Sequence, residues 1–180
     1  MTDGVLHYNR VACALHWTIA ILIVANLLVG LFHDAMKGWP VMPVHKSIGL
    51  TVLALSLFRL IWRITHPAPP LPNHMSRLEA GLAHGLHWLL YGFMIVMPLS
   101  GWIMSSAGDR PLNWFWMFDV PKFAVAKGDA ITGLSRGAHT VLGYTMAVLV
   151  LGHIGAALRH HFILKDRILN RMLKSAPTLN

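Results

Sequence analysis

Four long apolar stretches constrain this chain more than any other feature. A helix needs about 20 mostly apolar residues to cross the hydrocarbon core of a bilayer. Four stretches have that length, at about residues 11–32, 44–64, 82–104 and 138–158. None of them alternates apolar and polar residues as a strand would, so the predicted fold is all-α, an integral membrane four-helix bundle.

The composition agrees with a membrane protein. Of the 180 residues, 55% are apolar and 12% are charged, whereas a soluble domain carries about 25% charged residues. Cys13 is the single cysteine, which excludes a disulfide-rich secreted scaffold. The length suits a single membrane domain, residues 1–180. The first apolar stretch has full length, no basic segment before it and no small-residue cleavage site, so we expect a retained signal anchor.

The basic residues predict the orientation of the spans. The net charge is +8, and the segments on one side, which include both termini, carry nine basic and three acidic residues. Because basic loops stay in the cytoplasm, both termini are expected there. A basic net charge fits either nucleic acid or the cytoplasmic membrane surface, and the four apolar stretches favour the membrane. The outer basic residues would steer an anion or simply solubilise the loops. They are Lys37, Lys46, Arg110, Lys122, Lys127 and Arg136.

Two segments outside the spans have patterns of their own. The tail, residues 159–180, is predicted to form an amphipathic interfacial helix. Its apolar residues at helical spacing are Leu164, Ile168, Leu169, Met172 and Leu173. The longest loop, residues 105–137, contains a cluster of aromatic residues: Trp114, Phe115, Trp116 and Phe118. Such a cluster suits the headgroup region, although a hydrophobic protein-binding loop would look the same.

Histidines are the main polar residues inside the spans. A polar side chain is energetically expensive inside a membrane, so its presence there indicates a functional role. The interval from His139 to His153 is close to four helical turns, so the two share one face about 21 Å apart along the axis. Because helix directions alternate, His16 and His153 lie near the inner surface, and His45 and His139 near the outer surface. Two imidazoles that face each other across a bundle are the axial ligands of a b-type haem. We therefore predict two haems b, one for each pair.

Several glycines lie on the same helix faces. Gly30 follows His16, and Gly101 follows His87, at the same interval that separates His139 from His153. Gly49 and Gly143 each lie one turn past an outer ligand candidate. These four glycines would leave room for a flat macrocycle or simply let the helices approach closely.

Arg59 and His87 are further candidates for cofactor binding. Arg59 follows His45 at that same interval and is predicted at the inner depth, where it would pair with haem propionates or snorkel to the interface. His87 lies at the depth of His16 and His153, so three imidazoles compete for two axial positions. Its other partners would be a haem propionate, a quinone carbonyl or a backbone carbonyl.

Another class of protein stays open. A transporter or sensor could bind zinc, nickel or copper through intramembrane histidines, but it would gather them at one depth. The sequence has no glycine-rich nucleotide-binding motif after a strand, so direct oxidation of NADH is not expected.

Several motifs resemble the bacterial cytochrome b561 family, and the resemblance covers about residues 7–174. The motifs are Ala14-Leu15-His16-Trp17, His45-Lys46-Ser47, Gly81-Leu82-Ala83-His84-Gly85-Leu86-His87, and His160-His161-Phe162 followed by Lys165-Asp166 and Arg171-Met172. The resemblance implies a four-helix, di-haem protein of the bacterial inner membrane with ligands at His16, His45, His139 and His153. It does not assign His87 as an iron ligand.

The same resemblance implies a function. Such a protein moves electrons between membrane quinone, such as ubiquinone, and a periplasmic small-molecule or protein partner. Members of the family have been linked to superoxide oxidation with quinone reduction. The same helix arrangement occurs in the cytochrome b anchor subunits of hydrogenases and formate dehydrogenases, so an anchor role is the alternative.

Overall fold

The computed structural model describes residues 7–71, 75–166 and 168–173. Its elements are the helix α1 (Arg10–Phe32), the 3₁₀ helix η1 (His33–Met36), the helices α2 (Val41–Thr65) and α3 (Arg77–Ser106), the strands β1 (Asn113–Trp114) and β2 (Phe118–Asp119), the helix α4 (Ala130–Leu158), the π-helix η2 (Arg159–Ile163) and the short helix α5 (Asn170–Leu173). Within these described residues, four helical segments are long and apolar enough to cross a membrane. The predicted four-helix membrane bundle is confirmed, and each long helix contains the range predicted for it.

Local side-chain chemistry explains where the long helices begin and end. The Asn9 side chain caps α1 by accepting a hydrogen bond from the Ala12 amide at 2.8 Å. Ser76 and Glu79 form a capping box at the start of α3, each side chain accepting from the other residue's backbone amide, which pairs two amides that a helix leaves without partners. The proline-rich segment that follows Thr65 cannot continue α2.

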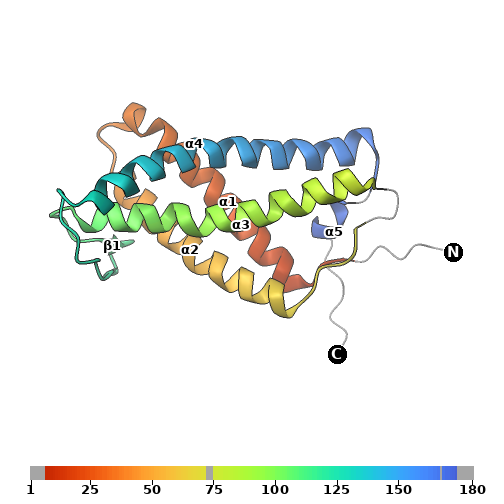
Figure 1. Cartoon of the computed structure of the whole chain (residues 1–180), viewed down its shortest axis with the longest axis horizontal. Coiled ribbons are helices and arrows are strands. Elements are labelled where there is room, and N and C mark those ends of the chain that lie inside the picture. The colour runs from red at the N-terminus through yellow and green to blue at the C-terminus, as the bar shows by residue number, and fades with distance from the viewer. Residues whose placement is uncertain (1–6, 72–74, 167, 174–180) are drawn as a thin grey trace.

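The four long helices alternate in direction between the two ends of the bundle (Figure 1). Helix α1 packs on α2, α2 on α3 and α3 on α4, whereas α1 and α4 meet at few points. We call the end of the bundle with the chain termini the termini end, and the opposite end, which carries the β1–β2 hairpin, the hairpin end.

Buried apolar side chains fill the middle of the bundle. Ile19, Tyr91, Met94 and Met146 form the buried core cluster. Many other large apolar side chains of the long helices point outward; Leu151, for example, is 70% exposed. An apolar exterior around a small apolar core is the arrangement that lipid requires of spanning helices.

The tail differs from the single amphipathic helix that the sequence predicts. Within its described residues, η2 ends at Ile163 and the next helix is the four-residue α5; Arg167 and residues 174–180 lie outside the described part. Trp17 Nε1 donates a hydrogen bond to the Met172 carbonyl at 3.0 Å, and the Tyr8 amide donates to the Arg171 carbonyl at 3.2 Å. These contacts tie the tail to α1, and helical periodicity does not encode them.

The capping box yields a stability prediction. We expect Ser76→Ala to reduce the stability of the protein by about 1 kcal/mol, because the Glu79 amide loses its acceptor at the start of α3. Thermal unfolding in detergent micelles measures the effect. Thr145→Ala is the matched control, because the Thr145 hydroxyl bonds only the carbonyl of Val141 four residues earlier. Equal unfolding temperatures for the two variants would contradict a stabilising role for the box.

Candidate functional site

Three histidines from three helices meet near the termini end. His16 of α1 and His153 of α4, which we call the terminal pair, have ring centroids 6.3 Å apart. His87 of α3 approaches the same His153 ring, with centroids 5.3 Å apart. The structure therefore brings together the three imidazoles that the sequence places at one depth.

Two further histidines meet near the hairpin end. His45 of α2 and His139 of α4, which we call the hairpin pair, have ring centroids 6.1 Å apart and ring planes at 83° to each other. Both pairs join residues that are distant in the sequence, and each contains one residue of α4.

Two of the four predicted glycines lie directly against the hairpin pair. A β-carbon built on Gly30 would lie 3.0 Å from His45 Cε1, and one built on Gly101 would lie 2.9 Å from His139 Cε1. Since these are at or inside the closest approach that β-carbons make, a larger residue would displace either ring. Gly30 and Gly101 thus make room for the imidazoles themselves.

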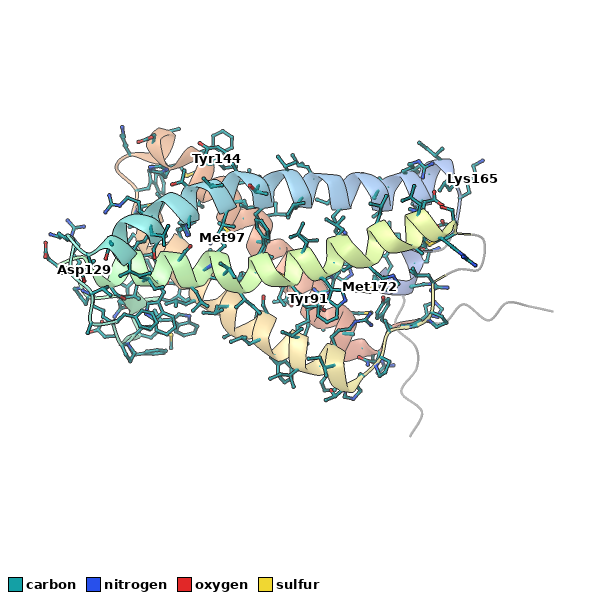
Figure 2. The ribbon with its side chains drawn as sticks, viewed as in Figure 1. Tyr91, Met97, Asp129, Tyr144, Lys165 and Met172 are labelled. Carbon is teal, nitrogen blue, oxygen red and sulfur yellow. The ribbon has the colours of Figure 1, made fainter. Side chains whose placement is uncertain are left out.

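A cavity of about 360 Å³ surrounds the hairpin pair. All four long helices line it, and Figure 2 shows two of the lining residues, Met97 on α3 and Tyr144 on α4. The four glycines singled out by sequence are part of its wall: Gly30, Gly49, Gly101 and Gly143. Its volume is within the range of small-molecule and cofactor sites.

The ring nitrogens differ in their hydrogen bonding. His139 Nδ1 lies 3.1 Å from both the Met97 carbonyl oxygen and Ser100 Oγ. If Nδ1 donates to the carbonyl, Nε2 is the unprotonated nitrogen that can ligate a metal. His87 Nδ1 lies 2.5 Å from the Ala83 carbonyl of its own helix. The sequence analysis did not predict the bond from α3 to His139. The sequence signal for it was Ser100, a serine among apolar residues of the third span.

One other imidazole nitrogen is orphaned. The Nδ1 atom of His16 is buried and has no hydrogen-bond partner among the residues that the structure describes. Buried polar atoms nearly always have partners in proteins. The His45 ring instead faces a backbone group of Asn26.

The donor set fits the axial ligation of a haem. An imidazole nitrogen lies about 2.0 Å from a metal that it ligates, so two imidazoles on opposite sides of one metal have centroids about 6 Å apart. The terminal pair at 6.3 Å and the hairpin pair at 6.1 Å match this separation, whereas His87 and His153 at 5.3 Å are closer.

The paired histidines occupy two levels of the bundle. Within the described ranges, no group of three or more His, Cys, Asp or Glu side chains is placed to hold a metal ion.

Two arginines of α2 lie toward the termini end. The Arg59 guanidinium stands over the Tyr91 ring, 5.6 Å from its centroid, and Arg63 Nη1 is buried without a hydrogen-bond partner among the described residues. A guanidinium with free donors inside a span suits an anionic group. The sequence analysis assigned Arg59, and not Arg63, to cofactor binding.

Comparisons with known proteins agree with the sequence resemblance. The family model of prokaryotic cytochrome b561 matches residues 7–175. The chain is 34% identical to "Cytochrome b561 homolog 2" of Escherichia coli (strain K12), over 92% of this chain and 90% of that protein. It is 28% identical to "Probable superoxide oxidase CybB" of Yersinia pestis, over 92% and 95% of the two chains.

The glycine contacts yield a prediction for cofactor content. Gly101→Ala should lower the haem bound per chain, because the new methyl group would displace the His139 ring. Gly92→Ala is the matched control on the same helix, since a β-carbon there meets nothing within 4 Å. Reduced-minus-oxidised spectra with a protein assay give the ratio. Equal haem content in the two variants would show that the His139 ring position is unimportant for binding.

Proposed function

The chain belongs to the prokaryotic cytochrome b561 family, and from this premise we propose that it is a di-haem b protein that carries electrons across the bacterial inner membrane. Electrons would pass between a membrane quinone and a periplasmic partner, in a reaction of the superoxide:ubiquinone type. The observation that carries the proposal is the presence of two imidazole pairs at two depths, each with a ring separation near 6 Å.

In this proposal, the terminal pair holds one haem and the hairpin pair holds the other. With two histidine ligands each, the haems would supply one-electron transfer and would not activate oxygen. His87 would stay beside the terminal pair as a neighbouring residue, because its ring lies 5.3 Å from that of His153, closer than the rings of either pair.

The other residues orient the ligands and separate the two levels. The Met97 carbonyl holds the His139 ring in one tautomer and orientation. Arg59 and Arg63 offer donors to an anionic group, such as a propionate, beside the terminal pair. The buried side chains of Ile19 and Met146 keep water out of the layer between the two pairs.

The charge distribution supports a cytoplasmic termini end. The sequence places nine basic residues on the side of the termini and six on the other, and cytoplasmic segments carry the excess of basic residues. The hairpin pair and its cavity would then lie on the periplasmic side.

Lys46 is the best-placed cation for attracting an anion to that cavity, because it lines the cavity wall. Lys127 is instead neutralised by Asp109 at 2.6 Å, and this contact lowers the pKa of the Asp109 carboxyl. A positive charge at the rim of a site raises the encounter rate with anions such as superoxide.

The ligand assignment is tested by haem content. His16→Ala and His153→Ala should each lose one haem of two, and the same one, because both residues belong to the terminal pair. His45→Ala and His139→Ala should lose the other. His87→Ala serves as the contrast and should keep both. Haem-to-protein ratios and low-temperature EPR spectra of the ferric state identify which haem is gone. Retention of both haems in His16→Ala, or loss of one in His87→Ala, would overturn the assignment.

The electron donor is tested through charge. Lys46→Glu should slow superoxide-driven reduction of ubiquinone roughly tenfold at low ionic strength, with the difference shrinking as salt screens the charge. Lys127→Gln is the control, because Lys127 does not line the cavity. Stopped-flow spectra of haem reduction measure both rates. The same rate in all forms would argue against anion steering, and copurification of a large periplasmic subunit would favour an anchor role.

A further inference from the structure

The β1–β2 hairpin is pinned to the side of α2. Ser47, 1% exposed, accepts a hydrogen bond from the Phe115 amide at 2.9 Å, and Trp114 Nε1 donates to Thr51 Oγ1 at 3.0 Å. Ser47 and Thr51 are six and ten residues past the start of α2, about 9 and 15 Å along the helix axis. The hairpin therefore packs against the first part of α2, at the hairpin end of the bundle (Figure 1).

The tip of the hairpin is apolar and exposed. Trp116 is 64% exposed, Met117 72% and Phe118 55%, and residues 111–118 contain no charged side chain. Phe115 and Trp116 have φ angles of 45° and 61°, a region that residues other than glycine rarely adopt. This rare backbone conformation is held by the contacts to α2, and it leaves the apolar tip uncovered.

The hairpin backbone is suited to an apolar environment. The Met117 amide donates to the Trp114 carbonyl at 2.9 Å, the Val120 amide donates to the Leu112 carbonyl at 2.7 Å, and the Phe115 amide is bonded to Ser47. Pairing these amides and carbonyls lowers the cost of placing the hairpin next to lipid, because an unpaired polar group is expensive there.

Other aromatic residues are exposed at the same end of the bundle. They lie where the adjacent spans end or begin: Phe32, 55% exposed, and Trp39, 77% exposed. Tryptophan in particular favours the boundary between headgroups and acyl chains. The exposed charged residues Arg110 and Asp119 flank the tip, which gives it the mixed apolar and charged character of that boundary.

We propose that the hairpin tip formed by Trp116, Met117 and Phe118 inserts into the lipid boundary at the hairpin end and anchors one wall of the cavity. Leu112, which directly precedes β1, is 3% exposed and lines that cavity. A tip held in lipid keeps Leu112 in place against the hairpin pair. The occupant of the apolar surface is thus phospholipid, and the inference does not depend on the proposed reaction.

Spin-label accessibility in the full chain tests the proposal. The single cysteine, Cys13, is buried and is replaced by alanine. Nitroxide labels are then placed one at a time at Met117→Cys, at Val148→Cys as the lipid reference, and at Ala124→Cys as the aqueous reference. Val148 is 69% exposed in the middle of α4, and Ala124 is exposed in the same loop as the hairpin. The protein is studied in nanodiscs of phosphatidylcholine and phosphatidylglycerol.

We expect the label at position 117 to be several-fold more accessible to oxygen than to a water-soluble nickel chelate. The label at position 148 should behave in the same way, and the label at position 124 should be more accessible to the chelate. A label at 117 that behaves like the one at 124 would overturn the proposal and assign the tip to a protein partner. A label-free measurement gives an independent answer. Trp116→Phe should lose part of the tryptophan fluorescence that brominated lipids quench, and an unchanged quenched fraction would count against insertion.

Discussion

An imidazole inside a bilayer needs partners for both of its nitrogens, and this requirement determines how the four helices of the bundle approach one another. Water is absent, so the partners must come from other helices or from a bound group. In this chain the imidazole rings face each other in two pairs, and the Met97 carbonyl of α3 lies within hydrogen-bond distance of His139. Helices that carry such residues cannot slide or rotate freely, because each pair fixes two helices at one depth.

For His139, the need for a hydrogen-bond partner is met within little more than one turn of α3. The Met97 carbonyl and Ser100 Oγ reach His139 Nδ1, and Gly101 gives the same ring the space that it occupies. Pro98 lies in this turn and also lines the cavity. Proline frees a carbonyl one turn earlier and is tolerated in spans where neighbours compensate. A short segment of α3 therefore packs closely against the His139 ring, forms a hydrogen bond with it and contributes to the wall of the cavity.

The spans and the depth matching were predictable because both are one-dimensional properties. The number of apolar residues gives a span, and the interval between His139 and His153, close to a whole number of helical turns, gives two depths on one face. The bond from Met97 to His139 was not predictable, since it depends on which faces of α3 and α4 meet. The position of the tail was not predictable for a similar reason. Its spacing suits an amphipathic helix, but hydrogen bonds from Tyr8 and Trp17, near the opposite end of the sequence, hold it to α1.

The two levels of the bundle differ in charge, and the difference bears on the direction of electron flow in the proposed function. Arg59 and Arg63 place two guanidinium groups toward the terminal pair, in a region where charge is weakly screened. Positive charge stabilises the state that has gained an electron. At the hairpin pair, an acceptor bonded to a ring N–H makes the His139 imidazole a stronger donor, which favours the oxidised state of a bound metal. Lys46, at the wall of the hairpin-end cavity, acts in the opposite sense, because its positive charge stabilises an added electron at the hairpin pair. The balance between the two guanidinium groups and this single ammonium group would set the difference in potential between the two levels.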